Sequence, residues 1–195
     1  DRSEIQKVAR IVREATEALA PGRDRVMAGE PVTYEREVVD AQGRTRWIRA
    51  RCVPDLNFDG KSEVLVGEPG WDGAGANTGR VQAVSGAGGA ILKIYTNYSG
   101  GTAGDRFGWA VAGLRDLDGD SRGDLIIGAI GWDSAPLVEV GGAFLISGNT
   151  GAVIGGASGY SNADYMGYAV ANGGDLNGDG FDDPLMSAPT SSGAY

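Results

Sequence analysis

Histidine is absent from this sequence, and cysteine occurs once, as Cys52. Without histidine the chain cannot form a Ser-His-Asp or Cys-His nucleophile system, or a zinc site with imidazole ligands. A single cysteine excludes an internal disulfide framework and a cysteine-rich zinc site. General acid–base chemistry by Asp, Glu, Lys or Tyr stays open. Together these absences favour a protein that is not an enzyme.

Basic residues and long apolar runs are also scarce. The chain has 17 Lys and Arg against 26 Asp and Glu, a formal net charge of −9. Nucleic-acid binding is therefore not expected, because phosphate contacts need clustered Lys and Arg. No stretch approaches the roughly 20 consecutive apolar residues of a membrane span. An acidic excess of this kind suits a cation ligand.

The composition changes near residue 54. Residues 1–54 hold 11 of the 17 basic residues, 9 of the 26 acidic residues and 3 of the 34 glycines. Residues 55–195 hold the remainder and are strongly acidic and glycine-rich. Such a shift indicates a domain boundary, so we predict one domain over 1–54 and another over 55–195.

The first domain is predicted to be an α-helix followed by a β-hairpin. An N-capping pattern and apolar residues at helical spacing predict the helix from Ser3 to Leu19. The stretches Val32–Val39 and Thr45–Val53 alternate in polarity and flank a short turn sequence. That pattern is typical of a β-hairpin.

The hairpin resembles the C-terminal part of a PAS sensor domain. The resemblance is carried by GEPVTYEREVVDAQGRTRWIRARCVPD, above all by Gly43 followed by Arg46-Trp47-Ile48. The other strands and helices of a PAS ligand pocket are missing, so no ligand or sensing role is implied. A plain helix-plus-hairpin linker is the alternative.

One acidic segment occurs three times in the second domain. It reads PDLNFDGKSEVLVGEP at 54–69, RDLDGDSRGDLIIGAI at 115–130 and GDLNGDGFDDPLMSAP at 174–189. Short apolar runs separated by glycine-rich turns lie between these landmarks. About four short strands per 60 residues is typical of a propeller blade or a similar all-β array. We therefore predict β repeats over 55–115, 116–174 and, in part, 175–195.

Each repeat begins with a nine-residue loop that carries oxygen-bearing side chains at positions 1, 3, 5 and 9. We name residues 55–63 the first loop, 116–124 the second loop and 175–183 the third loop. The predicted side-chain metal ligands are Asp55, Asn57, Asp59, Glu63, Asp116, Asp118, Asp120, Asp124, Asp175, Asn177, Asp179 and Asp183. At position 7, Lys61, Arg122 and Phe181 would each offer a backbone carbonyl.

These ligands suit Ca²⁺, which takes six to eight oxygen ligands, better than Mg²⁺, which keeps more of its water. Position 12, where an EF-hand carries an acid, is apolar in every copy, as Val66, Ile127 and Met186. Ordinary Asp, Asn and Gly turns are the alternative. Three copies in register favour metal sites, because packed carboxylates repel one another unless a cation lies between them.

Residues 55–195 resemble the FG-GAP repeat family, the integrin α-like β-propellers. Two pairs at the FG position precede their loops by nine residues, and three triplets stand at the GAP position after the loops. These are Phe107-Gly108, Met166-Gly167, Gly67-Glu68-Pro69, Gly128-Ala129-Ile130 and Ser187-Ala188-Pro189. The resemblance implies a seven-bladed propeller with calcium loops on one face and ligands on the other. The chain would then be an incomplete propeller of about two and a third blades.

The resemblance also implies a function. We expect a calcium-binding repeat segment in adhesion or protein–protein recognition, extracellular or at the cell surface, with a protein partner and structural calcium. An accessory region of a larger secreted enzyme is one alternative, and a catalytic constellation elsewhere in the full gene would favour it. An appendage of a PAS-type signalling protein is the other, and upstream PAS strands would favour that.

Overall fold

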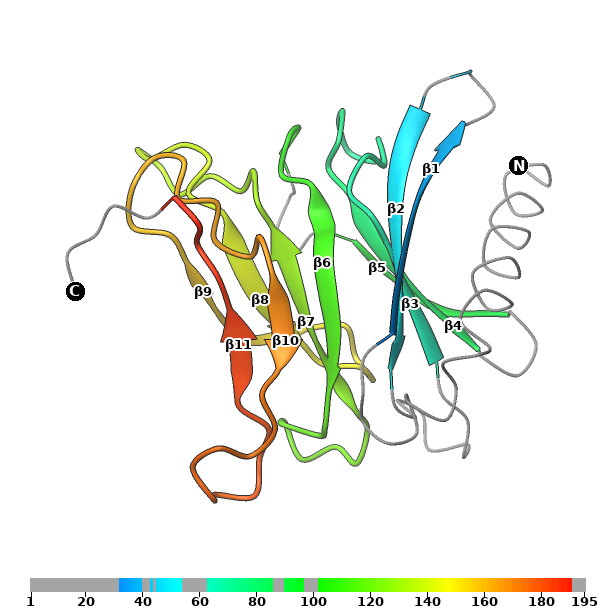
Figure 1. Ribbon diagram of the computed structural model, residues 1–195, viewed down its shortest axis with the longest axis vertical. Helices are drawn as coiled ribbons and strands as arrows, with labels where there is room; N and C mark the ends of the chain where they lie inside the picture. The colour runs from blue at the N-terminus through cyan, green and yellow to red at the C-terminus, as the bar shows by residue number, and fades with distance from the viewer. Residues whose placement is uncertain are drawn as a thin grey trace.

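The computed structural model describes residues 32–39, 43, 45–53, 63–85, 90–96 and 102–190. Within these residues the chain is mainly β and contains no helix, which confirms the predicted β class. Its strands form three antiparallel sheets (Figure 1). The helix predicted from Ser3 to Leu19 lies outside the described residues. None of the described residues belongs to a helix long and apolar enough to cross a membrane.

The first sheet contains five strands in the order β1-β2-β3-β4-β5. They are β1 (Val32–Val39), β2 (Thr45–Val53), β3 (Glu63–Glu68), β4 (Arg80–Ser85) and β5 (Ile91–Thr96). The predicted hairpin is confirmed, since β1 and β2 have the predicted bounds and pair antiparallel, with Val39 opposite Thr45.

Strand β2 joins the hairpin to the first repeat. It pairs with β3 from Arg49 opposite Gly67 to Val53 opposite Glu63. One sheet therefore contains strands from both sides of residue 54, where the composition changes. Although residues 45–53 contain no Phe-Gly pair, β2 holds the place beside β3 that β6 holds beside β7 in the next sheet.

The second sheet has four strands in the order β6-β7-β8-β9, and the third has two, β10 and β11. Their bounds are β6 (Phe107–Leu114), β7 (Asp124–Ala129), β8 (Gly142–Ile146), β9 (Val153–Ser158), β10 (Val170–Asn172) and β11 (Pro184–Met186). The second loop connects β6 to β7, and the third loop lies between β10 and β11. Each described loop thus forms the turn of an antiparallel pair.

Strands β3 and β7 are central in their sheets, and this explains their continuous apolar sequences. Every residue of β7 is buried, and β3 is buried from Glu63 to Gly67. A strand covered on both faces has no solvent side, so it loses the polar–apolar alternation of a surface strand. Strand β9, at the edge of the second sheet, alternates between half-buried and exposed residues instead.

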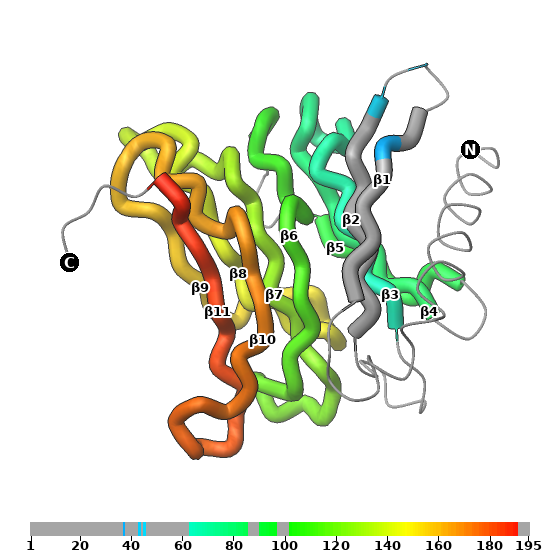
Figure 2. Tube along the Cα trace, viewed as in Figure 1, coloured from blue at the N-terminus to red at the C-terminus, as the bar shows by residue number. Residues whose placement is uncertain are grey.

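Two apolar cores hold the three sheets together. The larger core joins the first and second sheets, and the smaller joins the second sheet to β10. The larger contains Leu65, Val81, Ala83, Tyr95, Phe107, Val111, Leu125, Ile127, Ala129 and Ile146. The smaller contains Ala112, Leu114, Ile126, Ala143 and Val170. The second sheet therefore buries both of its faces, and Figure 2 shows the chain passing from sheet to sheet in sequence order.

Glycine pairs let neighbouring sheets approach closely. A Cβ atom placed on Gly67 of β3 would lie 2.2 Å from the carbonyl oxygen of Gly108 in β6. The same arrangement recurs one repeat later, where a Cβ atom on Gly128 would lie 2.0 Å from the carbonyl oxygen of Gly167. These glycines belong to the GAP and FG positions of successive repeats. The sheets can pack this closely because glycine has no side chain at these positions.

Candidate metal centre

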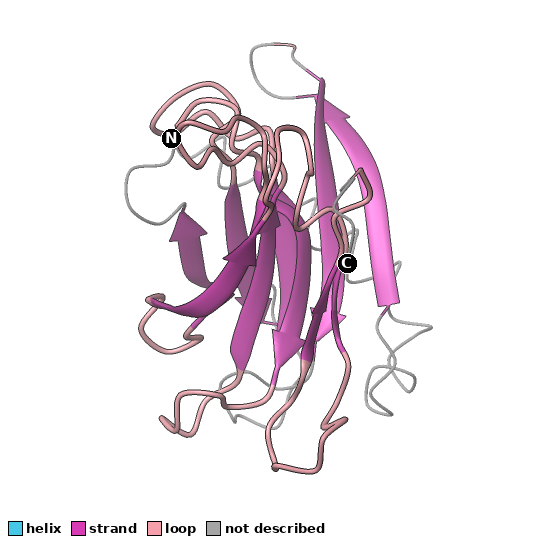
Figure 3. Ribbon diagram, turned by 90° about the vertical axis from the view of Figure 1, so that its left-hand side faces the viewer, coloured by secondary structure: helices cyan, strands magenta, loops and turns pink. Residues whose placement is uncertain are grey.

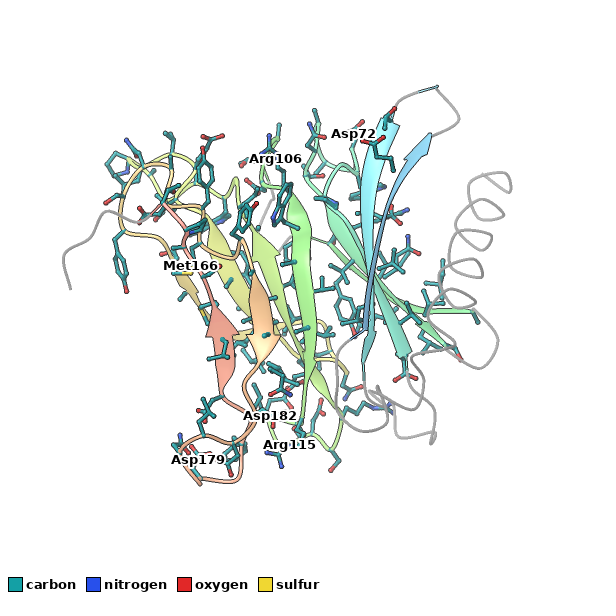
Figure 4. All side chains as sticks on the ribbon, in the orientation of Figure 1. Asp72, Arg106, Arg115, Met166, Asp179 and Asp182 are labelled. Carbon is teal, nitrogen blue, oxygen red and sulfur yellow. The ribbon has the colours of Figure 1, made fainter. Side chains whose placement is uncertain are left out.

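The second and third loops lie at one end of the sheets. In Figure 4, Asp179 of the third loop lies at the same end as Arg115 and Asp182, whereas Asp72 and Arg106 lie at the opposite end. Figure 3, turned by 90°, shows loops gathered at both ends of the strands. Because the repeats run in the same direction, equivalent loops fall on the same side of the molecule.

The second loop winds around the side chain of Asp116. Its Oδ1 accepts hydrogen bonds from the N–H groups of Gly119 at 2.7 Å and Asp120 at 3.2 Å, and its Oδ2 accepts one from Ser121 at 2.7 Å. Gly119 and Ser121 have positive φ angles of 81° and 66°. The backbone therefore curls tightly about the first carboxylate.

This winding brings three carboxylates together. The groups of Asp116, Asp118 and Asp120 each place an oxygen within 4.8 Å of the other two. Asp118 is exposed, and the other two are half-buried. The Oγ–H of the buried Ser147 lies 3.5 Å from Asp120 Oδ2. Three of the four side-chain ligands predicted for this loop therefore converge on one point.

Asp124, the fourth predicted ligand, is fully buried at the start of β7. Its Oδ2 accepts the N–H of Leu117 at 2.7 Å, and its Oδ1 accepts the N–H of Gly148 at 3.0 Å. Burial raises the pKa of Asp124 above its usual value, although these hydrogen bonds act in the opposite direction. In this structure Asp124 ties the loop to the β8–β9 turn. It also ends an Arg-Gly-Asp sequence, but a buried carboxylate cannot be presented to an adhesion receptor.

The third loop repeats this geometry. Asp175 Oδ1 accepts the N–H of Gly178 at 2.7 Å, and its Oδ2 accepts that of Gly180 at 2.9 Å. Asp183 Oδ2 accepts the N–H of Leu176 at 2.6 Å, as Asp124 does with Leu117. The remaining predicted ligands are also close, since Asn177 Nδ2 lies 3.1 Å from Asp179 Oδ2 and 3.3 Å from Asp183 Oδ1. Asn177 therefore contacts both Asp179 and Asp183, whereas the close carboxylate trio among the described residues is that of the second loop.

Residues at loop position 7 face outward. The N–H of Arg122 donates to Asp120 Oδ1, and that of Phe181 donates to Asp179 Oδ1, both at 2.9 Å. Both side chains are exposed. In the first loop, Asp55, Asn57, Asp59 and Lys61 lie outside the described residues. Glu63 is buried at the start of β3, the place that Asp124 holds at the start of β7.

The ligand set fits calcium. Every predicted side-chain ligand in the two described loops is a carboxylate or amide oxygen, and calcium is bound by such oxygens in flexible loops. A soft metal would need thiolate or imidazole ligands. The second loop would hold the ion through Asp116, Asp118 and Asp120. The third loop would hold one through Asp175, Asn177 and Asp179.

The second loop is linked to the first sheet through the β8–β9 turn. The hydroxyl of Tyr95 in β5 donates to the carbonyl oxygen of Gly148 at 3.0 Å, and Lys93 Nζ donates to that of Asn149. Since the N–H of Gly148 binds Asp124, one peptide segment contacts both the loop and β5. Burial raises the pKa of Tyr95, and the nearby carboxylates of Asp124 and Glu63 raise it further.

Asp182, at position 8 of the third loop, was not selected by sequence reasoning, and it contacts Arg115, the residue before the second loop. Asp182 is buried, and its carboxylate accepts hydrogen bonds from Arg115 and Asn172. Burial alone would raise the pKa of Asp182, but these hydrogen bonds hold it below its usual value. One sequence feature could have pointed to Asp182. Loop position 8 is acidic in the third loop alone, since it is Ser62 in the first loop and Gly123 in the second.

Acids at the opposite end of the sheets close turns. Asp133 Oδ1 accepts the N–H of Glu139, and Asp72 Oδ1 accepts that of Asn77. Asp164 Oδ2 accepts the N–H of Ser161. These carboxylates have local backbone partners, so the repeat of acids at this end has a structural explanation.

The fold and the loops define a class of protein, a β repeat protein whose strand pairs are joined by acidic, metal-loop-like turns. A family model described as the FG-GAP repeat matches residues 52–84. The match spans the end of β2, the first loop, β3 and most of β4. This match supports the predicted FG-GAP resemblance for residues 52–84. Repeats of this family are of the β-propeller type and fit a role in protein–protein recognition.

Proposed function

We propose that this chain is a calcium-stabilised segment of a β-propeller, without catalytic activity, that acts in extracellular adhesion or protein–protein recognition. The observation that supports it best is the convergence of Asp116, Asp118 and Asp120, whose oxygens lie within 4.8 Å of one another. The third loop supports it with the same hydrogen-bonding pattern one repeat later.

Electrostatics gives calcium a structural role. Two unit charges 4 Å apart repel by about 1 kcal/mol in bulk water and by about 4 kcal/mol at the effective dielectric of a protein surface. Three carboxylates therefore oppose folding of the second loop unless a cation offsets them. A calcium ion binds this arrangement only when the loop is folded, so its binding free energy adds to stability.

The loops are placed to brace strand pairs. The second loop is the turn between β6 and β7, and the third is the turn between β10 and β11. A filled loop would fix the end of each pair and the sheet-to-sheet spacing beyond it. The opposite end of the sheets would then carry the recognition surface, as the FG-GAP resemblance implies.

Calcium titration of the full chain by calorimetry tests this proposal. We expect two or three bound ions, and the loss of one in Asp120→Ala. Glu37→Gln, which removes an exposed carboxylate on β1, is the matched control and should bind as many ions as the parent chain. An absence of binding at millimolar calcium would contradict the proposal.

A further inference from the structure

Asp182 bridges the second and third loops. Its Oδ2 accepts the backbone N–H of Arg115 at 2.7 Å, and its Oδ1 accepts Arg115 Nε at 2.6 Å. Asn172 Nδ2 donates a third hydrogen bond, to Oδ2, at 2.6 Å. The Arg115 side chain is 60% exposed, whereas the Asp182 side chain is 3% exposed. The carboxylate is thus the buried centre of the bridge (Figure 4).

The bridge meets each loop beside a predicted ligand. Arg115 directly precedes Asp116, around which the second loop winds, and Asp182 directly precedes Asp183, which closes the third loop. The bond to the N–H of Arg115 involves backbone, so it fixes the start of the second loop as well as a side chain. The bridge therefore connects the end of the third loop to the start of the second.

No second copy of this bridge follows from the repeat. The residue before loop position 1 is Pro54 in the first loop and Gly174 in the third, and neither can form an ion pair with a carboxylate. From the first sheet to the β8–β9 turn, the described side-chain hydrogen bonds are those of Tyr95 and Lys93 to backbone carbonyls, and neither involves a carboxylate. The bridge is a property of one pair of repeats, so a general need of the fold does not explain it.

We infer that the second and third loops bind calcium as a positively coupled pair, with Asp182 as the positioning residue that links them. The inference rests on the proposed calcium function. Filling either loop orders the backbone on its side of the bridge, so the other loop loses less freedom when it binds. Coupling between linked sites is typically about 5-fold or more in affinity.

A binding cycle on the full chain measures this coupling. Asp59→Ala is included throughout to silence the first loop. Calcium affinities are then determined by calorimetry with both remaining loops intact, with Asp118→Ala, and with Asp179→Ala. With Asp182 present, we expect the overall association constant for two ions to exceed the product of the two single-loop association constants by at least about 5-fold. In Asp182→Asn this ratio should fall to about 1.

Arg115→Met separates positioning from simple charge. If Asp182 acted only by adding negative charge, removing the positive Arg115 would strengthen binding at each loop and leave the coupling unchanged. A bridge predicts a weaker coupling, because the Arg115 guanidinium no longer holds Asp182. This variant keeps Asp182, so it still tests the inference if Asp182→Asn fails to fold. Coupling unchanged in both variants, with melting temperatures lowered equally in calcium and in chelator, would overturn the inference alone. An absence of calcium binding by the parent chain would remove the proposed function as well.

Discussion

At the scale of single residues, the acids of one loop do different work. Asp118 is exposed and belongs to the carboxylate cluster, whereas Asp124 is buried and accepts two backbone N–H groups. The first arrangement is unfavourable without a cation, and the second is favourable without one. The sequence alone does not distinguish Asp118 from Asp124, because both are acids in the repeating pattern of one loop.

Neutral substitutions should separate these two roles. In chelator, Asp124→Asn should lower the free energy of unfolding by about 1–3 kcal/mol, because an amide NH₂ then faces a buried N–H donor. Asp118→Asn should leave it unchanged or raise it, because one repulsive charge is gone. In calcium, Asp118→Asn should also be destabilising relative to the parent chain. Urea unfolding measures both, and equal losses in chelator would contradict the assignment.

Tyr95 gives stability a dependence on alkaline pH. Burial, with Asp124 and Glu63 nearby, raises its folded-state pKa above the value of about 10 found in unfolded chains. The folded state therefore favours the protonated phenol, and the unfolded state releases the proton first. This contribution is complete below about pH 10 and is lost as the pH rises toward the folded pKa. We expect the free energy of unfolding, measured with urea at pH 8 and above about pH 10, to fall more steeply for the parent chain than for Tyr95→Phe. Parallel profiles for the two proteins would contradict this prediction.

At the scale of strands and loops, glycine pairs set how closely the sheets pack. In Gly128→Ala the new methyl group would meet the Gly167 carbonyl, so we expect a loss of about 1–3 kcal/mol from overpacking. Gly155→Ala in β9 is the matched control, since its nearest atom is the flexible Leu145 Cδ1 at 3.3 Å. Chemical unfolding compares the two. Equal effects would show that the close approach does not determine sheet spacing.

Local sequence predicted the strands well and their partners poorly. The hairpin strands β1 and β2 were predicted with their bounds, because alternation and a turn sequence are local signals. The apolar runs of β3 and β7 likewise mark buried strands. The pairing of β2 with β3 was not predicted, because it joins segments of different composition and β2 lacks the Phe-Gly pair. Sheet order depends on contacts that no single segment encodes.

Repetition in the sequence made the loop residues of the candidate site predictable, whereas the bridge residue Asp182 does not repeat. The predicted loop ligands recur at fixed offsets, so repetition in the sequence was enough to select them. Asp182 occurs at its loop position once, and its partner Arg115 is 67 residues away. Only the folded chain shows that a buried carboxylate joins the two loops. The first-loop ligands Asp55, Asn57 and Asp59 remain a prediction of the sequence.

At the scale of the whole molecule, the three sheets should differ in local stability. The third sheet is a pair of three-residue strands in the described structure, and Leu185 is 49% exposed there. Strand β7 is paired on both sides and fully buried. Hydrogen exchange followed by mass spectrometry should therefore be faster in β10 and β11 than in β7 in chelator. Calcium should slow it most in β10 and β11, and uniform exchange in both conditions would contradict this.

The central claim is that calcium holds the folded repeats together, and thermal unfolding of the full chain in calcium and in chelator tests it most directly. One site at 100 times its dissociation constant adds about 2.7 kcal/mol, which corresponds to a rise of about 5–10 °C for a chain of this length. We predict a rise of at least that size in calcium, and a smaller one in Asp120→Ala. Coincident melting curves in calcium and chelator would contradict the account.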